Sequence, residues 1–91
     1  MTLDTKYTIP STVMLQLVDD ETLLFDSATE LFFTLNEIGS LMWEIMSESS
    51  TLRAVYDELT EAYDVPADQL ETDIITFATS LSEQGLLVIG E

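Results

Sequence analysis

The stretch that decides the fold covers residues 31–39 and reads LFFTLNEIG. Its first half alternates, so that Leu31, Phe33 and Leu35 fall on one face of an extended chain while Phe32 falls on the other. This alternation predicts a β-strand in the first half of the stretch. The face that carries Leu31, Phe33 and Leu35 is expected to turn toward the core, and Phe32 is expected to stay partly exposed.

The spacing of the apolar residues changes at the end of that strand, from every second residue to every third or fourth. Asn36 is a favourable helix N-cap, and Glu37 follows in the first turn, where the helix dipole favours an acid. Apolar side chains then recur every three or four residues as far as Ser47, namely Ile38, Leu41, Met42, Ile45 and Met46. The sequence therefore predicts a helix that begins directly after the strand, with Trp43 in the core beside its apolar stripe.

Two more strands are expected upstream. Residues 12–18 read TVMLQLV and residues 22–25 read TLLF, and both runs consist largely of β-forming side chains. Turn residues at 19–20 (Asp-Asp) and 26–27 (Asp-Ser) separate the three runs. The pattern predicts an antiparallel meander of three strands. Residues 1–11 are expected to form a flexible N-terminal arm before it.

Two more helices are expected downstream. The first ends near Tyr63, and the second begins near Pro66 and stops at Gly85, the residue type that most often ends a helix. The apolar tail 86–89 is expected to pack back on the domain. Strands followed by helices indicate an α+β fold with a three-stranded antiparallel sheet followed by three helices, similar to a winged helix-turn-helix, in a single domain over residues 12–91.

The charge excludes several classes of partner. The chain has 18 acidic residues against only Lys6 and Arg53, for a net charge of −16. Nucleic acid is excluded, because Lys and Arg supply most of the affinity for phosphates, and the third helix carries no basic residue. Anionic membranes are disfavoured for the same reason. No signal peptide and no apolar run of about 20 residues is present, so we expect a cytoplasmic protein.

Catalysis by this chain is not expected. The chain has no Cys and no His, which removes the thiol nucleophile, the commonest general base and the commonest metal ligands. Carboxylates are abundant, but no glycine-rich loop or cofactor motif accompanies them, and the acids at residues 19–21 match no calcium-binding loop. We therefore expect no enzyme activity, no cofactor and no metal.

Two other classes stay open. An acyl or peptidyl carrier protein is also small and acidic, and Asp26-Ser27 provides the dipeptide at which such proteins carry phosphopantetheine, with Ser27 as the attachment site. However, Ser27 lies between two strand-like runs and is followed by Ala28, whereas carriers place this serine at the start of a helix. The second open class is a module that only contacts another protein subunit.

The order of the motifs also resembles a known family. The chain contains an aromatic pair, Leu-Asn, a glycine three residues on and an aliphatic-x-Trp element within residues 32–44, followed by TL at 51–52 and DIITF at 73–77, and it ends in GLL at 85–87. Together these segments resemble the PqqD-like family of RiPP recognition elements, domains that bind the leader segments of ribosomally made precursor peptides. The resemblance extends from about Val13 to Leu87.

The resemblance implies a mechanism and partners. The leader of a precursor peptide would lie as an extra strand beside the third strand, and the domain would deliver it to a maturation enzyme in trans. The size of the chain is most similar to the stand-alone partner of a lasso-peptide leader protease. A PqqD-type peptide chaperone of quinone cofactor biosynthesis is the alternative.

The resemblance also implies where the peptide would bind. An edge strand has unpaired backbone groups that can accept another strand, and the third strand of a meander can be such an edge. Asp73 is expected to lie off the apolar stripe of the third helix, where it could pair with a basic leader residue. The candidate peptide-binding residues are Glu30, Leu31, Phe32, Phe33 and Thr34 around the third strand, and Leu70, Asp73, Ile74, Thr76, Phe77 and Ser80 on the third helix.

Overall fold

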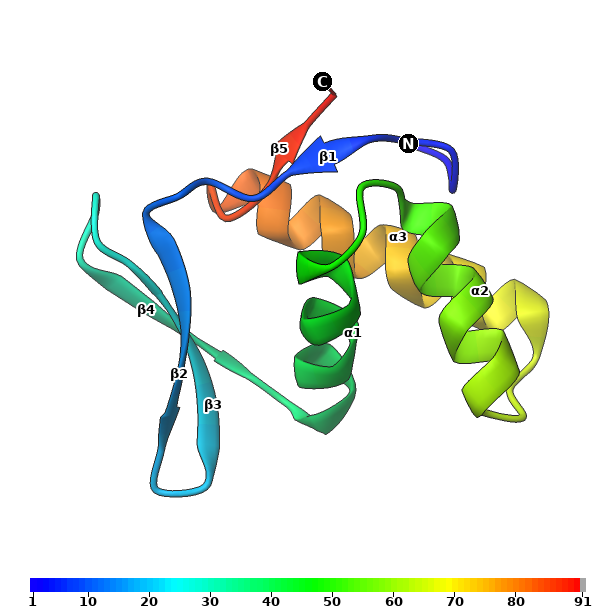
Figure 1. Cartoon of the computed structure of the whole chain (residues 1–91), viewed down its shortest axis with the longest axis horizontal. Coiled ribbons are helices and arrows are strands. Elements are labelled where there is room, and N and C mark those ends of the chain that lie inside the picture. The colour runs from blue at the N-terminus through cyan, green and yellow to red at the C-terminus, as the bar shows by residue number, and fades with distance from the viewer. Residues whose placement is uncertain (91) are drawn as a thin grey trace.

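The computed structural model describes residues 1–90 and contains two small sheets and three helices (Figure 1). The elements in chain order are β1 (Tyr7–Thr8), β2 (Val13–Val18), β3 (Glu21–Asp26), β4 (Leu31–Leu35), α1 (Glu37–Ser47), α2 (Leu52–Ala62), α3 (Ala67–Glu83) and β5 (Val88–Ile89). The expected order of three antiparallel strands and three helices is confirmed. The third strand of the sequence prediction is β4, because the short strand β1 precedes the meander. Residue 91, the expected end of the domain, lies outside the described residues.

The larger sheet has the order β2-β3-β4, so β3 is central and β4 lies at an edge. Val18 pairs with Glu21, which leaves Asp19 and Asp20 as a two-residue hairpin loop. Both loop residues have positive φ angles, 49° and 70°, as the tight turns that match the twist of a hairpin require. The turn expected at residues 19–20 is therefore confirmed.

The turn between β3 and β4 is held by Asp26. The buried side chain of Asp26 accepts a hydrogen bond of 3.0 Å from the backbone N–H of Ala28. The backbone carbonyl of Asp26 accepts another, of 2.7 Å, from the N–H of Glu30. Glu30 adopts a left-handed conformation with φ of 62°. Ser27 donates its hydroxyl to the Thr12 carbonyl at 3.2 Å, so this serine lies in a turn between strands and not at a helix start.

The hydrophobic core lies mainly among the helices and the two chain ends. Trp43, Leu52, Ile74 and Leu86 are buried there, and Leu24 of β3 is the buried hydrophobic residue that the larger sheet contributes. The expected burial of Trp43 is confirmed. Because the core draws on all three helices, α1 and α3 are fixed relative to one another.

The end of α3 is fixed by a hydrogen-bonded glycine motif. The N–H of Leu86 donates to the Leu81 carbonyl at 2.9 Å and the N–H of Gly85 donates to the Ser82 carbonyl at 3.1 Å, while Gly85 has φ of +77°. These are the two bonds of a Schellman motif. The motif turns the chain back so that Leu86 and Leu87 are buried, as expected for the apolar tail.

The first ten residues differ from the expected flexible arm. β1 pairs with β5 in an antiparallel two-stranded sheet, and Leu3 and Tyr7 are buried in the core. The Tyr7 hydroxyl donates a hydrogen bond of 2.7 Å to the Met46 carbonyl at the end of α1. Local sequence did not reveal this packing, because the partners of the arm lie at the far end of the chain and in α1.

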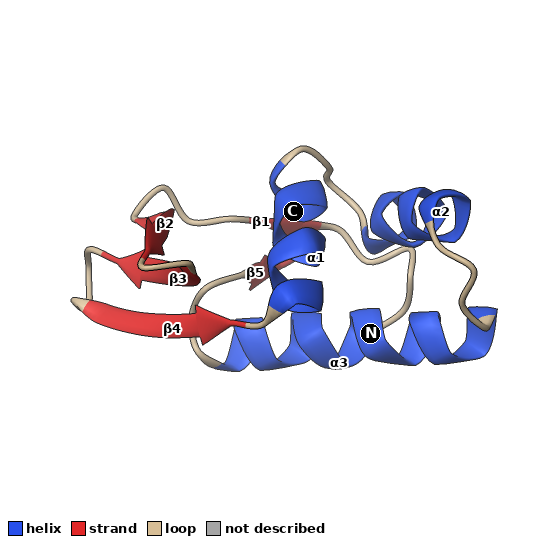
Figure 2. Cartoon of the chain, turned by 90° about the horizontal axis from the view of Figure 1, so that it is seen from below, coloured by secondary structure: helices blue, strands red, loops and turns tan. Residues whose placement is uncertain are grey.

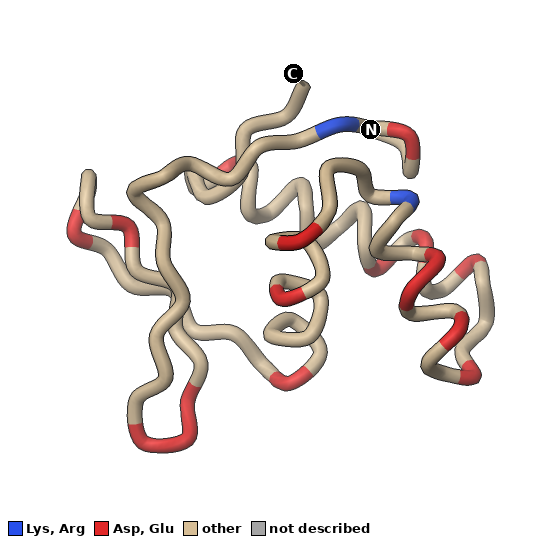
Figure 3. Tube along the Cα trace, viewed as in Figure 1, with Lys and Arg blue, Asp and Glu red and all other residues tan. Residues whose placement is uncertain are grey.

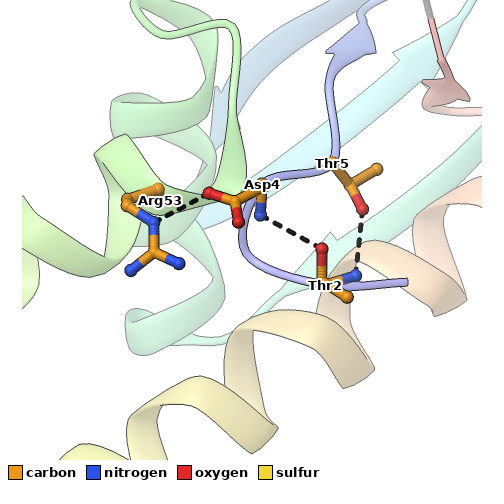
Figure 4. Close-up of polar contacts among 4 residues, drawn as sticks. All are labelled: Thr2, Asp4, Thr5 and Arg53. Atoms are coloured by element: carbon orange, nitrogen blue, oxygen red, sulfur yellow. Dashed lines mark hydrogen bonds and ion pairs between the residues drawn. The ribbon is translucent and has the colours of Figure 1, made fainter.

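A polar turn holds the start of the arm against α2 (Figure 4). The Arg53 Nε atom donates to an Asp4 carboxylate oxygen at 3.0 Å, and this hydrogen bond together with the charge of Asp4 raises the pKa of Arg53. Thr2 closes the turn through bonds with Asp4 and Thr5. Both charged side chains are largely exposed, so this ion pair adds little to stability, and the arm is held mainly by its buried apolar residues.

The helices cover only part of the sheet (Figure 2). Phe33 and Leu35 pack against the core, in line with the predicted inward face of β4. Leu31, predicted to share that face, is 55% exposed, because it lies at the far end of the strand. In β2, Leu15 and Leu17 lie on the same sheet face as the buried Leu24, yet both are exposed. None of the helices within residues 1–90 has the length and apolar character needed to cross a bilayer.

Candidate functional site

One edge of the larger sheet is open. β4 pairs with β3 through residues 31–35, and no strand within the described residues pairs with its other side. The backbone groups on that side of β4 have the geometry to accept an additional strand. Since α1 begins two residues after β4 ends, the open edge leads directly to the first turn of α1.

A hollow of about 400 Å³ lies at that point, between the first turns of α1 and the middle of α3. We call it the α1–α3 hollow. It is lined by Asn36, Ile38, Gly39, Met42, Asp73, Thr76, Phe77 and Ser80. Its apolar floor and polar flank suit a bound segment that presents apolar side chains on one side and polar groups on the other.

The absence of a side chain at Gly39 allows the two helices to approach closely. The Asn36 Oδ1 atom caps α1 by accepting a hydrogen bond of 2.7 Å from the Gly39 N–H. A Cβ atom at residue 39 would lie 3.1 Å from that oxygen and 3.4 Å from the Phe77 ring. Asn36 is thus the N-cap that the sequence predicted, and Gly39 leaves room for the Phe77 ring of α3.

Four of the predicted helix residues come together in the hollow. Asp73, Thr76, Phe77 and Ser80 line it, and all except the half-buried Phe77 are exposed. Ile74, which was also a candidate, is buried in the core and offers no surface to a ligand.

Leu70 is likewise nearly buried, but it contributes to a second hollow of about 260 Å³. This smaller hollow shares Ile38, Met42 and Asp73 with the first, so the two adjoin along the flank of α3. A segment that leaves the α1–α3 hollow along this flank therefore meets a second, mostly apolar depression.

The predicted strand residues divide between the two faces of β4. Phe32 pairs with Phe25 across the sheet, with ring centroids 4.7 Å apart, and is 58% exposed on the face away from the core. Thr34 lies on the same exposed face, whereas Phe33 packs partly against the core. Glu30 lies in the turn before the strand and not in β4 itself. These residues contribute the edge, and the hollow is built by other residues.

The sequence prediction did not include the side of the hollow that α1 provides. Ile38, Gly39, Met42 and Asn36 line it, but the sequence assigned them to helix capping and to the core stripe of α1. Ile38 is in fact 56% exposed. The position of Ile38 in the first turn, next to the strand end, is the one sequence signal that could have suggested this, because a first turn often extends beyond the core.

The hollow carries negative charge only. Asp73 accepts a hydrogen bond of 2.9 Å from the Gln69 side chain, which orients its carboxylate along α3. Neither of the two basic residues of the chain lines the hollow. Within residues 1–90, no group of three or more Asp or Glu residues has the arrangement of a metal site.

Comparison with known proteins assigns the family. The sequence profile of the family described as coenzyme PQQ synthesis protein D (PqqD) matches residues 21–87, which includes β3, β4 and all three helices. The chain belongs to the PqqD family. The resemblance of this PqqD-family chain to RiPP recognition elements is thereby confirmed.

Solved structures agree with this assignment. The chain is 28% identical to TbiB1, solved in complex with the TbiA(beta) leader peptide, with a TM-score of 0.79 over 88% of this chain and 93% of that one. It also shares the fold of a lasso peptide synthetase B1 complexed with the leader peptide, at 23% identity and a TM-score of 0.78, over 91% of this chain and 98% of that one. Comparison with curated protein sequences found no match.

Proposed function

We propose that this PqqD-family chain binds the leader segment of a ribosomally made precursor peptide and presents it to a maturation enzyme that acts in trans. In this proposal the leader adds to the open edge of β4 as an antiparallel or parallel strand, and its side chains enter the α1–α3 hollow. The chain binds and positions the peptide, and the chemistry is left to the enzyme. A lasso-peptide leader protease is the proposed enzyme.

The observation that carries the proposal is the position of the hollow at the end of an unpaired strand edge. Backbone pairing along β4 would fix the register of a bound peptide without regard to its sequence. Thr76, Phe77 and Ser80 in the hollow would then select among side chains. The two parts together give what peptide capture requires, namely affinity from the backbone and specificity from a pocket.

The leader complexes of the two similar solved structures support the same proposal, since each of those proteins was solved with a leader peptide. Of the two, TbiB1 has the higher identity to this chain. The location of Ser27 in a turn between strands favours peptide capture over a carrier protein, because a carrier needs its serine at the start of a helix.

A second candidate is a PqqD-type peptide chaperone of quinone cofactor biosynthesis. The description of the matching family profile favours it. Both candidates would bind their peptide at the β4 edge and the α1–α3 hollow, and they differ in which peptide binds there. A comparison of a lasso-peptide leader with the precursor peptide of a quinone cofactor pathway therefore separates them, because only the cognate peptide should bind tightly.

The experiment that tests leader capture is a fluorescence-anisotropy titration of the protein against labelled leader and core halves of its precursor. The leader half alone should bind. Thr76→Trp should weaken binding at least about tenfold, since a large ring in the hollow removes the space for leader side chains. Thr72→Trp is the matched control, because Thr72 is exposed one turn earlier on α3 and does not line the hollow.

Two results would contradict the proposal. One is a folded wild-type protein that binds neither half of the precursor. The other is equal loss of affinity in the Thr72 and Thr76 variants, which would mean that the hollow has no special part in binding. Far-ultraviolet circular dichroism of each variant shows whether the fold is retained, so that a folding defect is not mistaken for lost binding.

A further inference from the structure

A third hollow lies on another side of α1, between this helix and the hairpin of β2 and β3. Its volume is about 490 Å³, and it is lined by Leu15, Leu41, Glu44, Ile45, Ser47 and Glu48. We call it the hairpin groove. None of the residues that line the α1–α3 hollow lines this one, although Leu41 lines both the hairpin groove and the smaller hollow beside Leu70.

The sheet side of the hairpin groove is apolar and uncovered. Leu15 pairs with the buried Leu24 of β3, and paired residues point to the same side of a sheet. Leu15 therefore lies on the sheet face that turns toward the core. It is nevertheless 44% exposed, and Leu17, two residues farther along the same face, is 76% exposed. A partner that covered these two leucines would gain about 25 cal/mol for each Å² of apolar surface removed from water.

The helix side of the groove combines apolar and acidic residues. Leu41 and Ile45 are partly buried and join the groove to the core cluster. Glu44 of α1 and Glu48, the C-cap residue of that helix, are exposed at its rim. The acids of the hairpin tip, Asp20 and Glu21, border the neighbouring depression together with Glu37. The groove is thus an apolar strip between two acidic borders.

No cation offsets these acids nearby. Figure 3 shows the acidic positions of α1 and of the hairpin tip on the two sides of the space between them, and both basic positions at the far side of the molecule. Those basic residues are Lys6, whose backbone forms an isolated antiparallel β-bridge with Thr51, and Arg53, whose side chain forms an ion pair with Asp4. A second copy of this chain would bring acidic rims together, so the charge disfavours self-association through the groove.

We propose that the hairpin groove is a second docking surface, which takes an apolar segment flanked by Lys or Arg from the maturation enzyme. This inference rests on the proposed function in that the enzyme is the partner, but it concerns a surface that the leader does not use. Apolar side chains of the partner would cover Leu15 and Leu17, and its cations would lie against Glu44 and Glu48. The chain would then hold the leader on one side of α1 and the enzyme on the other.

The test measures enzyme binding and leader binding on the same protein samples. The probe is the leader protease encoded with the precursor peptide, titrated by isothermal calorimetry into wild type and variants. Leu17→Glu should weaken protease binding about tenfold or more, because it places a charge on the exposed apolar sheet face that continues from Leu15 of the groove. Glu44→Lys should weaken it about threefold or more and reduce its dependence on salt.

Two control variants change exposed residues that lie away from the groove. Val88→Glu adds the same charge at an exposed apolar residue of β5, and Glu58→Lys reverses an exposed acid on α2. Both should bind the protease within about twofold of wild type, since surface charges away from an interface change affinity little. All four variants should bind the leader within about twofold of wild type.

Several outcomes would overturn the inference, and one would refute only the proposed function. Unchanged protease affinity in Leu17→Glu, or no protease binding to wild type, would remove the docking surface while leader capture stands. Parallel loss of leader and protease affinity would mean that the two surfaces are not independent. Sedimentation that shows a wild-type dimer converted to a monomer by Leu17→Glu would assign the groove to a second copy of the chain. Loss of leader binding in wild type, with protease binding retained, would refute only the proposed function.

Discussion

Gly39 of α1 lies so close to Phe77 of α3 that a Cβ atom at residue 39 would be 3.4 Å from the aromatic ring. The same Cβ atom would be 3.1 Å from the Asn36 oxygen that caps the helix. The N-cap, the helix contact and the floor of the α1–α3 hollow therefore meet at one glycine. A change at this residue should affect both stability and peptide binding.

Gly39→Ala should lower the free energy of unfolding by about 1 kcal/mol. Crowding in a packed contact costs about 1–3 kcal/mol, and the better helix propensity of alanine returns at most about 1 kcal/mol. Urea denaturation measures the change. In a double-mutant cycle, Asn36→Ala should relieve part of the loss with a coupling of about 0.5 kcal/mol or more, since the Asn36 oxygen is the atom that the added Cβ would crowd, at 3.1 Å. A Gly39→Ala variant as stable as wild type would contradict the close approach.

Asn36→Ala should destabilise the protein by about 1 kcal/mol, because the variant loses the side-chain oxygen that caps the first turn of α1. Asn36→Ser keeps an oxygen that can accept the same N–H and should stay within about 0.5 kcal/mol of wild type. Thermal unfolding of the three proteins checks this. Equal loss in both variants would indicate that the cap is not what residue 36 contributes.

Asp20→Gly should stabilise the protein by about 0.5 kcal/mol. Asp20 has φ of 70°, a left-handed conformation that costs an L-residue about 1–2 kcal/mol, and glycine removes this cost at the expense of some chain entropy. Asp20→Ala keeps the steric cost and loses the local tolerance of aspartate, so it should destabilise. Chemical denaturation of both variants decides the matter, and an Asp20→Ala variant more stable than wild type would contradict the turn geometry.

Tyr7→Phe should remove part of the fall in the free energy of unfolding that occurs at high pH. Burial raises the pKa of Tyr7 from 10.0 to about 12, so the folded protein holds the phenolic proton more tightly than the unfolded chain does. The stability that this proton contributes is fully present below pH 10 and is lost as the pH rises through 12. The phenylalanine variant lacks the group and should show a flatter profile in that range.

At neutral pH the same variant should be about 1 kcal/mol less stable, since it loses the hydrogen bond to the Met46 carbonyl. Urea denaturation at pH 7 and at several values between about 9 and 12 gives both quantities. Tyr56→Phe is a suitable control, because Tyr56 is only partly buried. A profile of Tyr7→Phe with the wild-type slope would show that Tyr7 titration does not set the alkaline stability.

The open edge of β4 and part of the hollow could be predicted from local patterns. Alternation identified the strand, helical spacing placed Asp73, Thr76, Phe77 and Ser80 along α3, and the motif order pointed to the family. The exposure of Leu31 could not be predicted, because a periodic pattern gives the face of an element and not how far its neighbour extends. The packed N-terminal arm was missed for a related reason, since its partner β5 lies at the other end of the chain.

The sequence by itself determined the order and type of the elements, the caps at Asn36 and Gly85, and the excess of negative charge, because these depend on residues near one another in the chain or on composition alone. Only the tertiary structure decided that the first turn of α1 meets the middle of α3, and that the β2–β3 hairpin leaves Leu15 and Leu17 uncovered. Such contacts join residues far apart in sequence, and their geometry is set by how whole helices and strands pack.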